Sequence, residues 1–378
     1  MIKFKGMVYT RNCVFEPGLI TIEGEVIKEI LHCQKEELTQ EEQEQYLIPG
    51  LVDVHFHGAA GCDFCDGTVE AHQAIEVYEN VHGITSICPA TMTLPVEELK
   101  DIVRTAAECQ LQSIAGIHLE GPFISKEKKG AQKEEHIIPP SAEVLQELQQ
   151  EANGLIKIVS IAPETEGALE CIEKMQENFH FSIAHTMADY ETTKKAFIAG
   201  ADHVTHLYNA MPVSTHREPA VLGAAADHER VFVELICDGI HVHPAVVRNT
   251  FRIFGEDRVV LISDSMRATG MKDGNYTLGG QDVVVKGAVA TLTDGTIAGS
   301  VTNLFDCMRM AVSMGIPKET AVKAATINPA KSIGIDDIYG SIEVGKKANI
   351  LFVNADLQLE KVMICGKIIK EHKGNVAK

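Results

Sequence analysis

From residue 49 onward, short runs of β-branched and other apolar residues alternate with stretches of helical periodicity. Apolar residues recur at helical spacing in six stretches, at 69–81, 95–112, 141–152, 164–178, 189–199 and 244–254. The expected strands are 51–56, 84–88, 114–120, 156–162, 179–185, 203–207, 231–237 and 258–264. Nearly continuous apolar strands separated by helices are typical of a parallel sheet covered on both faces. Eight such strands favour an α/β fold of the closed (β/α)8 TIM barrel type over an open sheet.

The two ends of the chain have a different pattern. Residues 1–48 and 346–378 both contain short alternating segments, at 19–22, 26–31, 349–353 and 361–369. Because neither end could bury a sheet face alone, we expect them to pair into one small β-sandwich domain beside a catalytic barrel at 49–345. Glycines and short strands at 272–299 predict a hairpin insertion after the eighth barrel strand.

The composition excludes some classes of binding partner for this protein. The chain has 378 residues, of which 45% are hydrophobic and 23% charged, and its net charge is −19. This charge argues against nucleic acid or an anionic membrane as the partner. The absence of a long apolar segment at the start and ten scattered cysteines lead us to expect a cytoplasmic protein with reduced thiols. Cys62 and Cys65 form a single C-x-x-C, and without a partner pair we expect neither a zinc nor a redox role.

The first expected strand ends in His55-x-His57. Alternate residues of a strand point to the same side, so both imidazoles emerge together and can bind a divalent metal. Taken alone, the motif is equally compatible with two histidines in a polar turn.

Ionisable residues also close most of the other expected strands. Because the carboxyl ends of barrel strands build the active site, we expect these side chains to share one rim. Of the histidines on the sixth strand, His206 is the better ligand and His203 the likelier structural residue, and His118 is expected to support a ligand. The rim set comprises His55, His57, His118, Glu120, His185, His206, Asp238, His241 and Asp264. We expect six other histidines to be surface or packing residues, namely His72, His82, His136, His180, His228 and His372.

Several longer motifs connect these residues. They are Pro49-Gly-Leu-Val-Asp-Val-His-Phe-His-Gly58, His118-Leu-Glu-Gly-Pro-Phe123, Ala184-His-Thr186, Thr205-His-Leu-Tyr-Asn-Ala-Met-Pro212, Asp238-Gly-Ile-His241 and Thr296-Ile-Ala-Gly-Ser300. With them the chain resembles the amidohydrolase superfamily over essentially its whole length. Within that superfamily it is similar to the family of N-acetylglucosamine-6-phosphate deacetylases.

The resemblance implies a metal centre. Glu120, His185 and His206 would be the ligands of one metal ion. Some members of the family replace the His-x-His and use a single metal, whereas this chain keeps His55 and His57. A second ion is therefore expected to be possible, with Glu120 bridging and Asp264 nearby. Zinc, iron, cobalt and manganese suit such ligands about equally, so the metal and the number of ions, one or two per subunit, stay open.

The resemblance also implies the substrate contacts. Ala131, Asn209 and Ala210 would hold the sugar, and Ile297, Ala298 and Gly299 would close over it. His241 and Arg217 would meet the 6-phosphate, with Arg217 reaching in from the partner subunit of a homodimer. Several family members have a histidine, thought to polarise the acetyl carbonyl, where this chain has Gln132. The amide of Gln132 carries no charge, so carbonyl activation is expected to depend more on the metal.

The function expected from this resemblance is hydrolysis of the acetamide of N-acetyl-D-glucosamine 6-phosphate to D-glucosamine 6-phosphate and acetate. A metal-activated water would attack the carbonyl, with Asp264 taking its proton as general base and returning it as general acid. The alternatives are a deacetylase of the galactosamine epimer or another amidohydrolase, such as a cyclic-amide hydrolase. A non-catalytic scaffold is a further alternative, but it would be expected to lose rim ligands.

Overall fold

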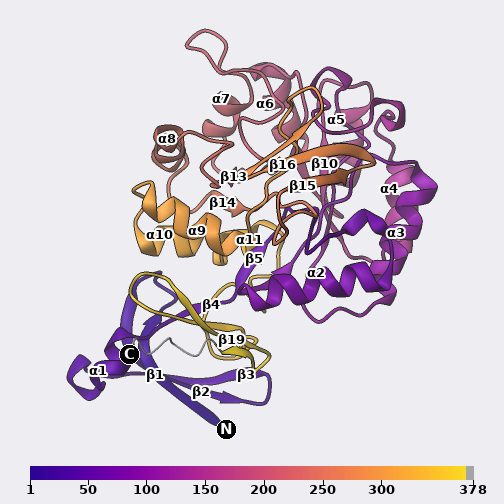
Figure 1. The fold of residues 1–378 in the computed structure, drawn as a ribbon. Coiled ribbons are helices and arrows are strands. Elements are labelled where there is room, and N and C mark those ends of the chain that lie inside the picture. The colour runs from indigo at the N-terminus through magenta and orange to yellow at the C-terminus, as the bar shows by residue number, and fades with distance from the viewer. Residues whose placement is uncertain (372–378) are drawn as a thin grey trace.

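The computed structural model describes residues 1–371 and is dominated by a curled parallel sheet of the TIM-barrel type (Figure 1). Six of its strands form one hydrogen-bonded sheet in the order β14-β13-β12-β11-β10-β9, and β5 pairs with β8 beside them. All of these pairings are parallel. The strands are β5 (Leu51–Asp53), β8 (Ile84–Ile87), β9 (Ile117–Leu119), β10 (Ile156–Ile161), β11 (His180–Ile183), β12 (His203–Val204), β13 (Phe232–Ile236) and β14 (Val259–Ile262).

Contacts between the strand ends join the two sheets at both sides. Parallel bridges from Ile87 to Ile114 and from Ala90 to His118 connect β8 to β9. On the other side, the amide of Asp264, just beyond β14, donates to the carbonyl oxygen of His55 at 3.0 Å. The eight strands therefore follow one another around a ring, as the alternating sequence pattern predicted.

The interior of the ring is apolar at one end and polar at the other. Val52, Ile158 and Ile262 belong to a buried cluster that also contains Ile333 and Ile335, which follow α11 (Ile327–Ser332). Residues of and after α11 thus fill the end of the barrel where the strands begin. The opposite end, where the strands finish, remains available for a site.

The helices described within residues 1–371 cover the outside of this ring and, with α11, one end of it, and their ends follow local signals in the sequence. Ser141 accepts a hydrogen bond from the Val144 amide and begins α4, and Pro244 lies in the first turn of α8. Gly200 ends α6, which matches the helical stretch expected at 189–199. The helices are α2 (Val69–Val81), α3 (Val96–Glu108), α4 (Ala142–Glu151), α5 (Ala168–Met175), α6 (Tyr190–Ala199), α7 (Ala220–Ala226), α8 (Pro244–Phe254), α9 (Leu304–Ser313), α10 (Lys318–Ala324) and α11.

The two ends of the chain meet in a separate seven-stranded sheet, in the order β20-β19-β18-β4-β1-β2-β3. Its central contact is antiparallel and pairs Ile350 of β18 with Pro49 of β4. The predicted strand at 361–369 is two strands, because a turn at Cys365-Gly366 reverses the chain. The seven strands are β1 (Ile2–Tyr9), β2 (Phe15–Glu23), β3 (Val26–His32), β4 (Tyr46–Pro49), β18 (Ile350–Val353), β19 (Leu359–Ile364) and β20 (Lys367–Glu371), and α1 (Gln40–Glu44) follows β3.

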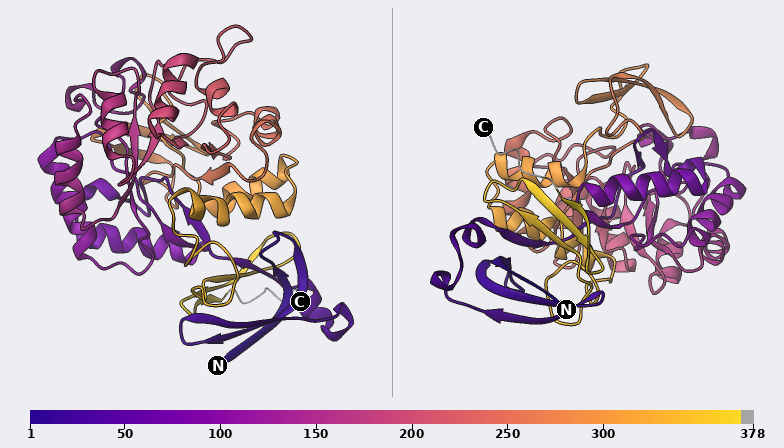
Figure 2. Two further views of the ribbon diagram at one scale, coloured as in Figure 1. Left: turned by 180° about the vertical axis from the view of Figure 1, so that it is seen from behind. Right: turned by 60° about the horizontal axis from the view of Figure 1, so that its bottom comes forward.

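The predicted insertion after β14 is a three-stranded antiparallel sheet. It consists of β15 (Gly274–Leu278), β16 (Gln281–Lys286) and β17 (Val289–Leu292). Figure 2 shows that this sheet projects from the side of the barrel opposite the small terminal sheet.

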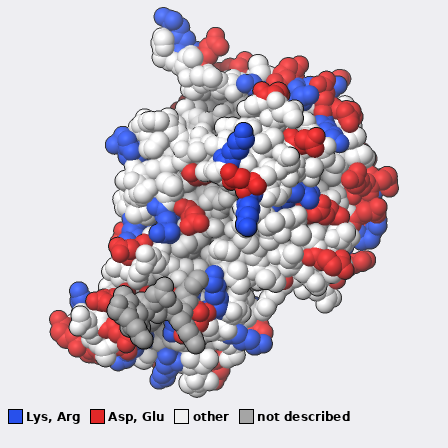
Figure 3. All heavy atoms as spheres, in the orientation of Figure 1, with Lys and Arg blue, Asp and Glu red and all other residues white. Residues whose placement is uncertain are grey.

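The charges on the surface and the state of the cysteines are those expected from the acidic, cysteine-containing composition. On the face shown in Figure 3, acidic side chains gather along the edge near α3 and α4, and basic ones are interspersed elsewhere. All ten cysteines are free thiols, and five of them are buried. Within residues 1–371, no helix combines the length and the apolar character needed to cross a membrane.

Candidate active site

Three of the expected ligands lie at the point where a barrel strand ends. His185, His206 and Asp264 follow β11, β12 and β14, and their φ angles are +42°, +30° and +49°. Left-handed backbone is uncommon for residues other than glycine. This left-handed conformation turns the chain sharply at the end of the strand. Each of the three side chains therefore lies at the rim, between the rigid strand before it and the loop after it.

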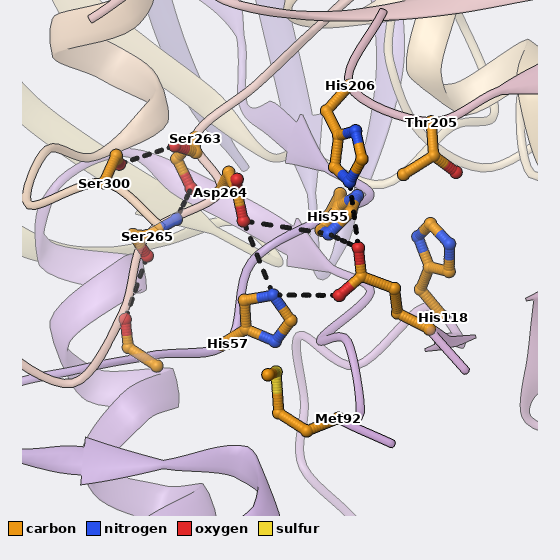
Figure 4. A network of polar contacts seen from close by, with 12 residues as sticks. His55, His57, Met92, His118, Thr205, His206, Ser263, Asp264, Ser265 and Ser300 are labelled. Atoms are coloured by element: carbon orange, nitrogen blue, oxygen red, sulfur yellow. Dashed lines mark hydrogen bonds and ion pairs between the residues drawn. The ribbon is translucent and has the colours of Figure 1, made fainter. Parts of the chain in front are cut away.

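The carboxylate of Glu120 is the centre of the cluster. Its Oε1 lies 3.1 Å from Nε2 of both His185 and His206 and 3.4 Å from Nε2 of His55. Its Oε2 lies 3.3 Å from Nε2 of His57. Figure 4 shows that His55 and His57, both from the segment after β5, and His206, from the segment after β12, point toward one another. Both predicted triads, His55-His57-Glu120 and Glu120-His185-His206, are thus brought together with their ligand atoms within 4.8 Å of one another.

Asp264 lies beside the same cluster. Its Oδ1 is 3.4 Å from Nε2 of His57 and 3.8 Å from Nε2 of His55. Burial raises the pKa of this carboxyl group, but the hydrogen bond to His57 and the other histidines outweigh burial and lower it. Asp264 is therefore a carboxylate at neutral pH and can accept a proton.

The cluster has the charge and the free donor atoms of a cation site. Burial lowers the pKa of His57, whereas the hydrogen bonds that His57 donates to the Asp264 and Glu120 carboxylates raise it to about 10. Two buried carboxylates thus attract positive charge into this rim. Nε2 of His55 is buried without a hydrogen-bond partner among the described residues, although it faces Glu120. A divalent cation would satisfy both the orphaned nitrogen and the carboxylates, so the residues present fit a metal ion.

A second layer of buried polar residues lies beneath the cluster, and its key member, Glu234 of β13, was not among the residues predicted from sequence. Glu234 Oε2 accepts a hydrogen bond from Nδ1 of His55 at 2.9 Å, and its Oε1 lies 3.4 Å from Nε2 of His203. The sequence does contain a sign of this role, because Glu234 is the one charged residue inside the apolar strand expected at 231–237. His118 is also buried here, and its Nε2 contacts the hydroxyl of Ser160 at 2.8 Å.

Gln132 is engaged with the cluster by both ends of its amide. Its Oε1 accepts from the Thr93 amide at 2.6 Å, and its Nε2 donates to Glu120 Oε2 at 2.8 Å. The orientation is unambiguous because the Thr93 amide is a donor, so the amide oxygen must face it. In this arrangement Gln132 holds one oxygen of Glu120.

A cavity of about 370 Å³ opens above the cluster, and most of the predicted substrate contacts line it. Of the predicted residues, Ala298 is buried behind the wall, and Arg217 is exposed and does not line this cavity. The predicted residues on the wall are His57, Glu120, Ala131, Gln132, His185, His206, Asn209, Ala210, His241, Asp264, Ile297 and Gly299. The wall also contains residues that were not predicted as substrate contacts, namely Met92, Glu127, Lys128, Gly130, Leu278 and Thr296, of which Thr296 begins one of the motifs found in the sequence.

His241 presents an imidazole, paired with the carboxylate of Asp238, to the cavity. Its Nδ1 lies 2.6 Å from Asp238 Oδ2, and Asp238 Oδ1 accepts from the amides of Ile240 and His241 at 2.9 Å. Burial lowers the pKa of His241, but the Asp238 carboxylate outweighs burial and raises it. Because Nδ1 is occupied, Nε2 is the nitrogen left to bind an anion.

The histidines expected to lie away from the rim do so where the structure describes them. His72 packs against Phe64 with ring centroids 4.6 Å apart, and His180 pairs with Asp202 at 2.7 Å. His372 lies outside the described residues. The Cys65 thiol accepts a hydrogen bond from the amide of Met92 at 3.2 Å.

Comparison with known proteins places this arrangement in a family. The model of the amidohydrolase family matches residues 46–369. The N-acetylglucosamine-6-phosphate deacetylase of Bacillus subtilis is 37% identical, with 98% of this chain and 95% of that protein covered. The N-acetylgalactosamine-6-phosphate deacetylase of Escherichia coli O157:H7 is 33% identical, with 87% and 89% covered. The crystal structure of the N-acetyl-D-glucosamine-6-phosphate deacetylase from Mycobacterium smegmatis superimposes with a TM-score of 0.92 at 31% identity, covering 98% of this chain and all of that one. The chain belongs to the amidohydrolase family.

Proposed function

We propose that this chain hydrolyses the acetamide of N-acetyl-D-glucosamine 6-phosphate to D-glucosamine 6-phosphate and acetate. The observation that carries the proposal is one cavity that joins a candidate metal centre to a cationic imidazole, His241. An amide placed on the centre and a phosphate placed on His241 would belong to the same small molecule. Relatives named N-acetylglucosamine-6-phosphate deacetylase, at up to 37% identity, support the choice of substrate.

In this proposal Glu120, His185 and His206 would hold one divalent ion, and His55 and His57, together with Glu120, would provide the ligands for a second. Zinc, iron, cobalt and manganese are all compatible with these ligands. A bound ion would lower the pKa of a coordinated water from 15.7 toward about 7 and so provide a nucleophile at neutral pH.

Asp264 is the general base and then the general acid. As a carboxylate close to both His55 and His57, it takes the proton of the attacking water. The protonated Asp264 then donates to the amine nitrogen, so that glucosamine 6-phosphate leaves as a neutral amine. A C–O bond forms between the water oxygen and the carbonyl carbon, the C–N bond breaks, and the acetic acid that results loses the second proton of the water to solvent as acetate. Asp264 is an acid only between the two proton transfers.

The remaining predicted residues bind the substrate. Ala131, Gln132, Asn209 and Ala210 line the cavity between the metal centre and His241, and we assign them to the sugar. Ile297, Ala298 and Gly299 form the segment that closes over it. Arg217 is exposed, in keeping with its proposed role of reaching the phosphate of a partner subunit in a homodimer.

The second candidate is the galactosamine epimer. The observation that favours it is the E. coli relative named N-acetylgalactosamine-6-phosphate deacetylase, at 33% identity. The two substrates differ in one hydroxyl group, so the choice depends on loop contacts around the cavity. A non-catalytic scaffold is disfavoured because each of the predicted ligands is present at the rim.

The organisation of the whole protein is part of the proposal. We infer a small β-sandwich domain from residues 1–48 and 346–378 and a catalytic barrel at 49–345, supported by the pairing of β4 with β18. The last seven residues of the second segment lie outside the described residues. We also infer a cytoplasmic location, which the ten free thiols support.

The test is acetate release from N-acetylglucosamine 6-phosphate and N-acetylgalactosamine 6-phosphate, with and without chelator, alongside elemental analysis. We expect the glucosamine substrate to be hydrolysed faster and chelator to abolish the reaction. Unphosphorylated N-acetylglucosamine is the control and should react much more slowly. Equal rates with and without the phosphate, or no acetate from either epimer, would contradict the proposal.

A further inference from the structure

Glu234 is a fully buried carboxylate that no step of the proposed reaction uses. It lies on β13 with none of its surface exposed, on a strand whose neighbours Val233 and Leu235 are also fully buried. Burying a carboxylate costs free energy unless the group is paired and hydrogen-bonded. Its contacts therefore indicate what Glu234 does.

One oxygen of Glu234 joins two expected metal ligands. Oε2 accepts from Nδ1 of His55 at 2.9 Å and from the backbone amide of His206 at 3.2 Å. The other oxygen lies 3.4 Å from Nε2 of His203 and 3.9 Å from Nδ1 of His118. Glu234 thus lies behind the His55 ring, on the side away from Glu120.

The contact fixes the tautomer of His55. An ionised carboxylate is only an acceptor, so Nδ1 of His55 carries the hydrogen, and in the neutral imidazole that binds a metal ion Nε2 then presents the lone pair. Nε2 is the nitrogen that lies 3.4 Å from Glu120 and has no hydrogen-bond partner among the described residues. A ligating histidine is held in this way by an acceptor at its second nitrogen, which also raises its basicity.

The other expected ligands are supported differently. Nδ1 of His57 and of His206 have no hydrogen-bond partner in the described part of the chain, and Nδ1 of His185 donates to the carbonyl oxygen of Lys128 at 2.8 Å. A carboxylate therefore orients the ring of His55 and of no other ligand in the cluster.

We propose that Glu234 is a positioning residue that holds His55 in the metal-binding tautomer and orientation, and that binding of the second metal ion depends on it. This inference rests on the metal centre of the proposed function. It concerns metal binding, so it can fail while the hydrolysis stands.

The experiment compares Glu234→Gln with the unmodified protein by Zn²⁺ content and by chelator competition. We expect the more weakly held of two ions to bind about 10–100-fold less tightly in the variant, with the other ion unchanged. Glu79→Gln is the matched control, because Glu79 is another fully buried glutamate, and its two oxygens have no partner among residues 1–371. That control should keep both ions.

A double-mutant cycle separates this role from a general effect on folding. In a His55→Asn background, Glu234→Gln should change Zn²⁺ binding no further, because its target is gone. Additive losses in the cycle, or equal Zn²⁺ binding by Glu234→Gln and the unmodified protein, would overturn the proposal. Acetate release by the unmodified protein is measured in parallel. Two bound ions without hydrolysis would contradict the proposed function and leave the role of Glu234 intact.

Discussion

At the scale of single residues, three residues at the rim have backbone conformations that are unfavourable without support from the surrounding structure. His185, His206 and Asp264 each have positive φ angles, which cost about 1–3 kcal/mol apiece. Hydrogen bonds hold two of them in place, from the Asp264 amide to the His55 carbonyl and from the His206 amide to Glu234. Strain of this kind persists where the surrounding structure enforces it, and it aims these side chains at one point.

Replacing Asp264 by Asn should leave metal bound and lower kcat by about 10²–10⁴-fold, because the amide cannot accept the proton of water. The measurement is acetate release at saturating substrate, with elemental analysis of the same sample. Activity within a few-fold of the unmodified protein, at full metal content, would rule out Asp264 as the general base.

Replacing Asp238 by Asn should weaken recognition of the phosphate. Without the carboxylate at Nδ1, burial dominates and the pKa of His241 falls, so the imidazole is neutral at pH 7. Losing a charge-assisted hydrogen bond costs about 1.5–3 kcal/mol, so KM for the phosphorylated substrate should rise about tenfold or more.

The effect of Asp238→Asn on KM should also change the pH dependence of KM, in a direction that follows from the pKa of His241. In the unmodified protein His241 is charged below its raised pKa, so KM should rise only as the pH passes above that value. In the Asp238→Asn variant the rise in KM should begin at lower pH. The control is unphosphorylated N-acetylglucosamine, whose slow hydrolysis should be indifferent to the substitution. A KM profile that does not move would show that His241 is not the phosphate contact.

That the candidate ligands would lie close together could be predicted from sequence, because each of them follows an apolar strand and parallel strands end at one rim. Glu234 and the contact of Gln132 with Glu120 could not, since which buried groups meet across a barrel depends on the register between strands. Arg217 shows a different difficulty. Its proposed role is to bind the phosphate in the site of the partner subunit, and the contacts within a single chain do not show such a role.

At the scale of elements, the insertion β15–β17 forms part of the wall of the cavity. Leu278 at the end of β15 lines the cavity, and Gln281 at the start of β16 donates to the carbonyl oxygen of Ala131 at 2.5 Å. This bond connects the insertion to the loop that carries Gln132. The helices expected at 69–81 and 244–254 are α2 and α8, whereas those expected at 95–112 and 164–178 are shorter in the structure, as α3 and α5. The strand expected at 203–207 is only His203–Val204, because the left-handed residues of the rim end it early.

Replacing Gln281 by Ala should loosen the contact between the insertion and this loop. One hydrogen bond contributes about 1 kcal/mol, so KM should rise about fivefold while kcat stays nearly constant. Steady-state kinetics and the melting temperature test this together. Asp282→Ala, at a neighbouring exposed position, is the control. Unchanged KM in Gln281→Ala would mean that the insertion does not shape the substrate site.

At the scale of the whole molecule, the candidate metal centre lies where the ends of several barrel strands meet. His55 follows β5, Glu120 follows β9 and His206 follows β12, so a bound ion connects segments far apart in the sequence. Metal binding should therefore stabilise the folded state as a whole.

Removing the metal with chelator should lower the melting temperature by about 3–8 °C, given that a ligand at 100 times its Kd stabilises by about 2.7 kcal/mol. Differential scanning calorimetry before and after dialysis measures the shift. Adding Zn²⁺ back should restore the original value, whereas Mg²⁺, which prefers oxygen ligands, should not. An identical melting temperature with and without chelator would contradict a metal site built across the barrel.

The pairing of β4 with β18 has a consequence for how the chain is made. The two partners are about 300 residues apart, so at typical rates of synthesis β18 leaves the ribosome roughly 15–60 s after β4. During that interval one edge of β4 has no strand beside it, and an open edge can pair with other chains. The barrel segment is complete before β18 appears, so the terminal sheet is assembled last. Early loss of the nascent chain to aggregation would then begin at the small sheet, although the chemistry of the protein lies at the opposite end of the barrel.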